Sequence, residues 1–331
     1  MIISGTNIGG GSGPLVGWSM GDPPPSSGGG GGSSTQKAIF GYGYSDFGFE
    51  SRTNLVSNTG VVAADTIGVG TARWQLGAAG YGGDKAIFGY GAPSFGSGGI
   101  STINLVSNTG VVAGDTTGAG TVRYAVAAAG YGGDKAIFGY GRPSSSTVYY
   151  SMTNLVSNTG VVAGDTAGVG SARRNLSAAG YGTDKAIFGL GLATGSTHVA
   201  ITNLVSNTGV VSTDTAAVSG VSARQGAAAA GYGTDKAIFG YGTFFGALAV
   251  TNLISNTGVV AANQAAITGT ARAGLAAAGY GGDKAIFGYG INSTSDNVST
   301  TNLVSNTGVV ATNTTGVGRT RQYLAAASYS A

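Results

Sequence analysis

The stretch ARAGLAAAGYGGDKAIFGYG, residues 271–290, contains two short apolar segments separated by a glycine-rich turn. Its second half recurs at intervals of 48 to 51 residues, with KAIFG beginning at Lys37, Lys85, Lys135, Lys185, Lys236 and Lys284. A second stretch, NLVSNTGVV or NLISNTGVV, begins at Asn54, Asn104, Asn154, Asn203, Asn252 and Asn302. Most of the 331-residue chain is therefore made of six copies of one unit.

Each complete unit contains four segments with the composition of short β-strands. LAAAG, KAIFG, NLVS and GVVAxDT are apolar or β-branched and are bounded by Gly, Asn, Ser and Thr. The SNTG segment between the last two is a tight turn, because Asn and Gly tolerate positive φ. Four strands in a unit of this length predict one blade of a β-propeller. The Ala-rich strand is expected to be innermost, where the blades converge and leave the least room.

The two ends of the repeat region predict a closed ring. The first unit starts at KAIFG without an Ala-rich strand, and the chain finishes RQYLAAASYSA, which supplies that strand over residues 324–328. A C-terminal strand that completes the first blade leaves no open blade and protects the strand edges. We therefore predict an all-β, six-bladed propeller of four-stranded blades over residues 37–331, preceded by an extended Gly/Ser/Pro-rich arm over residues 1–36.

The arginine, the small apolar strand, the glycine-rich loop and the strand ending in glycines resemble the kelch repeat, over about 295 residues of the chain. Kelch proteins form β-propellers, often with six blades and with closure by strands from both chain ends, so the resemblance implies this fold. The sequence departs from the family where GYG replaces the paired glycines and where the later Tyr and Trp are missing. No kelch ligand is therefore carried over. The uniform repeats also show a weaker resemblance to predicted structural proteins of tailed phages.

The composition limits the chemistry that the chain can perform. It has 64 Gly, no Cys and a formal net charge of +3, which excludes disulfides and thiolate sites and argues against a nucleic-acid partner. No apolar run has the length of a membrane span, and no signal peptide is recognisable. His198 and Glu50 are the only residues of their kinds. We predict no enzymatic activity, no cofactor and no metal site.

One arginine precedes each Ala-rich strand: Arg73, Arg123, Arg173, Arg224, Arg272 and Arg321. Guanidinium groups in six equivalent positions suit hydrogen bonding to loop carbonyls or to an Asp of the same or a neighbouring blade, which would tie the ring together. The alternative is a ring of arginines around the channel mouth that binds an anion or carboxylate. A structural ring is favoured, because sixfold repetition does not suit one asymmetric site.

The segment between GYG and NLVSN differs in every unit, whereas NLVSNTGVV barely changes. Equivalent loops of a propeller share a face, so the six diverse loops are expected to lie together. These loops carry the large aromatic residues Phe47, Phe49, Phe95, Tyr149, Tyr150, Phe244 and Phe245. A face with aromatic rings and little charge suits contact with a protein or a sugar. Drift in unconstrained loops is the alternative interpretation.

The arm carries an apolar cluster in GPLVGWSM, residues 13–20. Fully extended, the arm would reach roughly 120 Å, which is enough to pass a whole ring and contact another molecule. The predicted anchor residues are Ile2, Ile3, Leu15, Val16, Trp18 and Met20. A neighbouring copy is the favoured receiver. Docking on another assembly component, and folding back on the same ring, are the alternatives.

These features predict a non-catalytic structural protein that self-assembles head-to-tail into an extracellular fibre or a virion appendage. Its expected partners are other copies of itself or another virion component. The alternative is a recognition module, such as a lectin or a phage receptor-binding propeller, which uses the variable loops and takes a cell-surface glycan as its partner. Neither a nucleic-acid partner nor a membrane span is expected.

Overall fold

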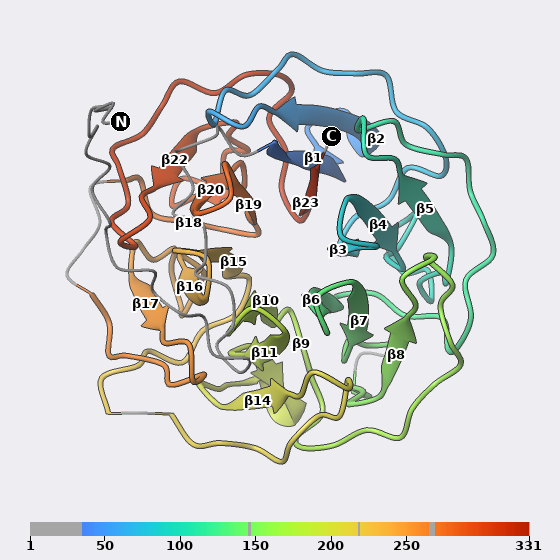
Figure 1. Cartoon of the computed structure of the whole chain (residues 1–331), viewed down its shortest axis with the longest axis vertical. Coiled ribbons are helices and arrows are strands. Elements are labelled where there is room, and N and C mark those ends of the chain that lie inside the picture. The colour runs from blue at the N-terminus through green and yellow to red at the C-terminus, as the bar shows by residue number, and fades with distance from the viewer. Residues whose placement is uncertain (1–34, 145–146, 218, 265–268, 331) are drawn as a thin grey trace, which may run out of the picture. The chain divides into compact units, whose positions relative to one another are not determined.

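The computed structural model describes residues 35–144, 147–217, 219–264 and 269–330. Six three-stranded antiparallel sheets surround a central axis and are called blades 1 to 6 (Figure 1). The predicted all-β, six-bladed propeller is therefore confirmed. The predicted anchor residues of the arm lie outside the described residues.

Each blade contains one inner, one middle and one outer strand, and the strands of each kind follow in order from blade 1 to blade 6. The inner strands are β23 (Ala325–Ser330), β3 (Gly77–Tyr81), β6 (Ala127–Tyr131), β10 (Ser177–Tyr181), β15 (Ala228–Tyr232) and β19 (Ala276–Tyr280). The middle strands are β1 (Gln36–Ser45), β4 (Lys85–Gly89), β7 (Lys135–Gly139), β11 (Lys185–Gly189), β16 (Lys236–Gly240) and β20 (Lys284–Gly288). The outer strands are β2 (Gly48–Val56), β5 (Ile103–Val106), β8 (Thr153–Val156), β14 (Thr202–Val205), β17 (Thr251–Ile254) and β22 (Thr301–Val304).

Two small additional sheets form beside the loops that follow the middle strands. One contains β9 (Arg173–Arg174), β12 (Leu192–Ala193) and β13 (Thr197–His198), with the 3₁₀ turn η1 (Thr194–Ser196) between the last two. The other contains β18 (Arg272–Ala273) and β21 (Ile291–Asn292). They pair residues next to the buried arginines with the variable segments, which ties those segments to the ring.

The middle strands form the core of the ring, because each is covered on both faces by neighbouring blades. The Ala, Ile and Phe of KAIFG are completely buried in all six copies. The ring of Phe138 in β7 packs edge-on against Tyr90 of the preceding blade, with centroids 5.1 Å apart. Gly89 makes this contact possible, since a Cβ atom there would lie 2.7 Å from Cζ of Phe138. The last glycine of KAIFG is thus a packing requirement between blades.

Ring closure follows the predicted arrangement. β23 pairs with β1 in antiparallel register from Gln36↔Ser330 to Gly41↔Ala325. In Figure 1 the last strand of the chain lies beside the first strand, although they are far apart in sequence. The inner strands of neighbouring blades also contact one another around the axis. Small side chains are required there, because a Cβ atom on Gly80 would lie 3.1 Å from the carbonyl oxygen of Ser328.

The fourth segment of each blade differs from the prediction of a full strand. In blade 2, the segment after the SNTG turn makes only isolated bridges to β5, at Val106↔Val112 and Ile103↔Thr116. Between these bridges the side chain of Asp115 accepts a hydrogen bond from the amide of Asn104, at 2.9 Å. Because side-chain bonding replaces a continuous ladder at this edge, each blade has three strands and a loosely paired fourth segment.

Candidate functional site

The ring has two faces that carry different loops, because successive strands of a blade run in opposite directions. The variable-loop face carries the loops between the middle and outer strands, such as residues 90–102 in blade 2. The hairpin-turn face carries the turns between the inner and middle strands, such as residues 82–84, and the SNTG turns, such as residues 107–110. The first face is diverse between blades and the second is nearly uniform.

Arg123 illustrates how the six arginines are held. Its Nε donates to the carbonyl of Tyr140 at 2.8 Å, and one terminal nitrogen donates to Oδ1 of Asn154 at 2.6 Å. The other terminal nitrogen donates to the carbonyl of Thr121 at 3.1 Å. The guanidinium also lies over the ring of Tyr90 in the preceding blade, 4.3 Å from its centroid. The side chain therefore links two blades.

Asp165 completes this network from the fourth segment of the same blade. Its carboxylate accepts hydrogen bonds from the backbone and the hydroxyl of Thr121, the latter at 2.6 Å. It also lies 3.7 Å from the guanidinium of Arg123. Burial alone would raise the pKa of Asp165, but the hydrogen bonds from Thr121 and Asn154 outweigh burial, so the pKa is lowered. The carboxylate is therefore charged at neutral pH.

The six predicted arginines occupy equivalent places, and all are completely buried with 0% exposure: Arg73, Arg123, Arg173, Arg224, Arg272 and Arg321. A guanidinium without exposed surface is not available to a ligand at the channel mouth. The structure therefore places all six guanidinium groups inside the ring.

Arg224 has a different environment from the others. The aromatic ring of the preceding blade is replaced by Leu190, and the aspartate of its own blade is replaced by Asn263. Three hydrogen bonds remain, to the carbonyls of Tyr241 and Ser222 and to Oδ1 of Asn252, at 2.7, 3.0 and 2.7 Å. Burial lowers the pKa of Arg224 to about 10.

A closed ring of backbone hydrogen bonds surrounds the channel at the variable-loop face. Each donor is the amide of a residue between the arginine and the inner strand, and each acceptor is the equivalent carbonyl of the neighbouring blade, at distances of 2.5 to 3.1 Å. The six residues all have positive φ: Gln75, Ala125, Asn175, Gly226, Gly274 and Tyr323. Because the six residues are of different types, the sequence alone does not predict the conformation that they share.

The predicted aromatic residues of the variable loops divide into two groups. Phe47, Phe95, Phe244 and Phe245 are 81%, 60%, 45% and 92% exposed, whereas Phe49, Tyr149 and Tyr150 are half-buried. Phe244 and Phe245 pack edge-on against each other at 4.6 Å between centroids. The guanidinium of Arg319 lies 4.4 Å from the centroid of the Phe47 ring.

Trp74 organises an aromatic cluster that the sequence interpretation did not include. Its ring lies 5.1 Å from Phe95, 5.9 Å from Tyr44 and 6.2 Å from Phe49, measured between centroids. The backbone of Trp74 pairs with Ala92 at the start of the variable loop. A signal was present, because the residue after each buried arginine varies between copies: Trp74, Tyr124, Arg174, Gln225, Ala273 and Gln322.

His198 lies in a second aromatic cluster on the same face. Its ring packs edge-on against Phe244 at 5.1 Å and lies 6.1 Å from Phe245, between centroids. Burial and the nearby charge of Arg174 lower the pKa of His198, so the imidazole is neutral at neutral pH.

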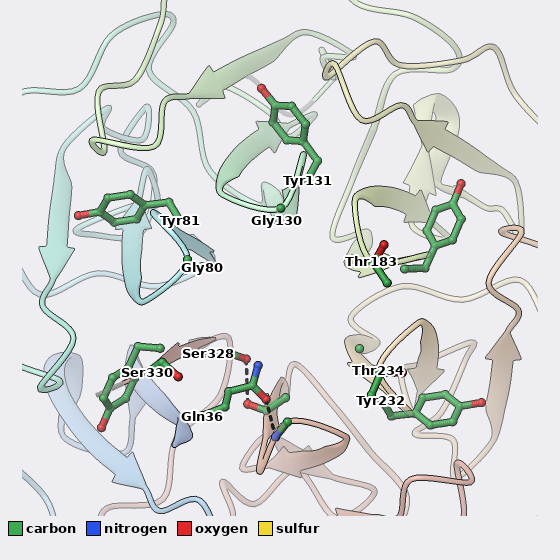
Figure 2. Close-up of a pocket in the computed structure, with 18 of the residues that line it drawn as sticks. Gln36, Gly80, Tyr81, Gly130, Tyr131, Thr183, Tyr232, Thr234, Ser328 and Ser330 are labelled. Atoms are coloured by element: carbon green, nitrogen blue, oxygen red, sulfur yellow. Dashed lines mark hydrogen bonds between the residues drawn. The ribbon is translucent and has the colours of Figure 1, made fainter. Parts of the chain in front are cut away.

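On the hairpin-turn face the channel opens into a cavity of about 300 Å³ (Figure 2). The wall carries the glycines of the inner strands, such as Gly80 and Gly130, and the rings of Tyr81 and Tyr131 point away from the cavity. On the variable-loop face the channel holds a smaller cavity of about 110 Å³, lined mostly by Ala, Gly and Leu. The two ends of the channel thus differ in size and in the residues that line them.

The solved structure of YjhT is similar to this chain, with a TM-score of 0.58 over 78% of this chain and 90% of that one. The two sequences are 11% identical. The chain has the kelch-like β-propeller fold. No protein-family model matches the sequence, and no curated protein does.

Within the described part of this kelch-like propeller, no group of three or more His, Cys, Asp or Glu side chains is arranged to hold a metal ion. None of the helices formed by the described residues is long and apolar enough to cross a membrane. What the described surface of the propeller offers is contact area on one face and a polar cavity on the other.

Proposed function

We propose that this propeller is a non-catalytic recognition module that binds a carbohydrate surface through its variable-loop face. The observation that carries the proposal is the position of the exposed phenylalanines. They lie on the loops that differ between blades, above arginines and middle strands that are the same in every blade. Diversity confined to one exposed face of a uniform scaffold is typical of a binding surface.

The aromatic residues also have a suitable chemical character. Phe245 and Phe95 are 92% and 60% exposed, and large apolar side chains with this much exposed surface are unfavourable in water. Sugar rings present C–H faces that pack on aromatic rings, and the Trp74 cluster supplies a broad aromatic support under Phe95. Few charged residues lie on these loops, which favours a neutral glycan over a highly charged partner.

The test is binding of the labelled full-length chain to an array of microbial and animal glycans. The F95S/F245S variant should lose most of the signal on any glycan bound by the unmodified chain. The matched control is Val111→Ser, because Val111 is equally an exposed apolar residue but belongs to the uniform part of blade 2. Absence of glycan binding, or equal binding by the two variants, would contradict the proposal and leave a protein as the partner to examine.

Head-to-tail self-assembly is the second candidate function, as a fibre or a virion appendage outside the cell. The observation that favours it is the placement of the start of β1: Gln36 lines the cavity on the hairpin-turn face, whereas the exposed phenylalanines are on the opposite face. The chain therefore enters the ring at the hairpin-turn face. The exposed apolar side chains lie on the variable-loop face. Sedimentation velocity should then show concentration-dependent assembly of the full chain and none after deletion of residues 1–33.

A further inference from the structure

The cavity on the hairpin-turn face is lined by a ring of lysines that the recognition surface does not use. Five of the six KAIFG lysines contribute to its wall: Lys85, Lys135, Lys185, Lys236 and Lys284. Their side chains are between 43% and 46% exposed, so all five are accessible to a ligand to the same degree. The repeat thus places equivalent lysines of five blades in the wall of one cavity.

Each lysine is held by the aspartate that precedes it in the sequence. Nζ of Lys135 donates to Oδ1 of Asp134 at 2.9 Å, and the other lysines of the ring make the same bond at 2.6 to 3.0 Å. The second carboxylate oxygen of Asp134 accepts a hydrogen bond from the amide of Asn158 in the SNTG turn, at 3.0 Å. Asn256 and Asn306 hold Asp235 and Asp283 in the same way.

The cavity wall contains the lysines and not their aspartates. Asparagines of the SNTG turns hold three of these aspartates, Asp134, Asp235 and Asp283. Among the described residues that line the cavity, no side chain is acidic. The remaining polar groups of the wall include the hydroxyls of Thr183 and Thr234, which donate to the carbonyls of Gly182 and Gly233 at 2.6 Å, and the hydroxyl of Ser330.

The rim of the cavity is also held in place before any ligand arrives. The amide of Gly82 donates to the carbonyl of Asp134 in the next blade at 2.7 Å, and this bond recurs around the ring. At the split blade, Ser330 donates to Asp84, and Gly281 donates to Gln36, both at 2.9 Å. A rim closed by backbone hydrogen bonds loses little conformational freedom on binding.

We propose that this lysine-ringed cavity binds a compact multivalent anion of the condensed-phosphate class. A cavity of about 300 Å³ accommodates a small ligand and not a folded domain. Lysine acts toward phosphate as a compact point charge, so geometry at each contact is not demanding. Each lysine already has a carboxylate partner, and a single phosphate would therefore gain little. An ion with several charged groups can contact lysines of several blades at once.

Four of the five lysines have a raised pKa and so keep their charge over a wide pH range. The hydrogen bond from Lys135 to Asp134 raises the pKa of this lysine, and the equivalent bond raises the pKa of Lys85, Lys185 and Lys284. The pH dependence of binding should therefore come from the phosphate groups of the ligand. Binding should strengthen as the terminal phosphate loses its last proton near pH 6, and it should weaken as salt is added.

The experiment is isothermal titration calorimetry of the full chain with tripolyphosphate at low ionic strength. Orthophosphate, which has a single phosphate group, is titrated for comparison. We expect one tripolyphosphate per chain and at least tenfold weaker binding of orthophosphate. The variant K135Q/K185Q/K236Q should weaken tripolyphosphate binding at least tenfold. The control R52Q/R142Q/R174Q removes the same net charge outside the cavity wall and should change affinity less than twofold.

A second variant keeps the test independent of lysine replacement. Thr183 and Thr234 line the cavity at φ of +70°, a conformation that Asp tolerates better than Thr. T183D/T234D should therefore fold, place carboxylates in the wall and abolish binding. Undetectable tripolyphosphate binding to the unmodified chain, equal binding of orthophosphate, or equal loss in the arginine control would overturn the proposal.

Discussion

Arg123 in blade 3 and Arg224 in blade 5 occupy equivalent, completely buried positions with different neighbours. Arg123 has the carboxylate of Asp165 at 3.7 Å and the ring of Tyr90 at 4.3 Å. Arg224 keeps its three hydrogen bonds within its own blade, although both of those neighbours are replaced. Hydrogen bonding alone is therefore sufficient to hold this position, and the carboxylate and the ring add stability to it.

The two sites should respond differently to loss of the guanidinium. Arg123→Met leaves Asp165 without its cation and leaves two buried acceptors unpaired, so we expect a loss of about 3–5 kcal/mol of unfolding free energy. Arg224→Met leaves no carboxylate behind, and the expected loss is about 1–3 kcal/mol. Urea unfolding followed by circular dichroism measures both. Equal losses would mean that the carboxylate contributes nothing.

Asp165→Asn converts the carboxylate of blade 3 into the group that blade 5 already has. Loss of charge-assisted hydrogen bonds from Thr121 should cost about 1.5 kcal/mol, toward the lower end for such bonds because the side chain is 30% exposed. The pKa of Asp165 is lowered in the folded state, so its contribution is complete above about pH 4 and is lost as pH falls through the folded pKa. The difference in unfolding free energy between the unmodified chain and the Asp165→Asn variant should therefore be largest at pH 7 and smaller at pH 3. Urea unfolding at both pH values measures it.

Leu190→Tyr restores the missing ring above Arg224. Leu190 has φ of +64°, the same value as Tyr90, so the backbone already has the conformation that Tyr adopts at the equivalent position. A cation–π contact should raise the unfolding free energy by about 1 kcal/mol. The reciprocal change Tyr90→Leu in the same urea assay should lower it. A destabilised L190Y variant would show that blade 5 has repacked around the leucine.

Phe245→Ser should have the smallest effect on folding, within about 0.5 kcal/mol, because the side chain is 92% exposed. This prediction compares Phe245 of a variable loop with Phe88 of the core. Thermal unfolding measures the effect, with Phe88→Ser in the core as the contrasting variant. A strongly destabilised F245S would mean that the variable loops help to hold the ring together.

Most of the fold follows from local patterns that the six copies repeat. KAIFG and NLVS are strands in every blade, and the C-terminal Ala-rich segment pairs with the first strand as predicted. The fourth segment was mispredicted as a full strand because its Val residues suit a strand. Strand propensity does not include side-chain hydrogen bonds. In this segment Asp115 accepts hydrogen bonds from Asn104 and Thr71, which draw the segment away from the outer strand.

The candidate sites were less predictable. Differences between copies identified the variable loops and their phenylalanines, and the same comparison applied to the residue after each arginine would have found Trp74. The lysine ring had no such signal, since an uninterrupted Asp-Lys pair in every complete repeat is equally consistent with a solvated turn. Its placement around a cavity depends on the radius of the closed ring.

The repeat period, the residue pattern and the two half-blades at the chain ends specify strand positions, blade number and closure, because these depend on local conformation and on counting. The roles of the two sets of basic residues depend on contacts between blades. The arginines are covered by aromatic rings of the preceding blade in all but one case, where Leu190 replaces the ring. The lysines line a cavity at the hairpin-turn face, and asparagines of the SNTG turns hold three of their aspartate partners. Burial of one ring of charges and exposure of the other arise only when six blades close around a common axis.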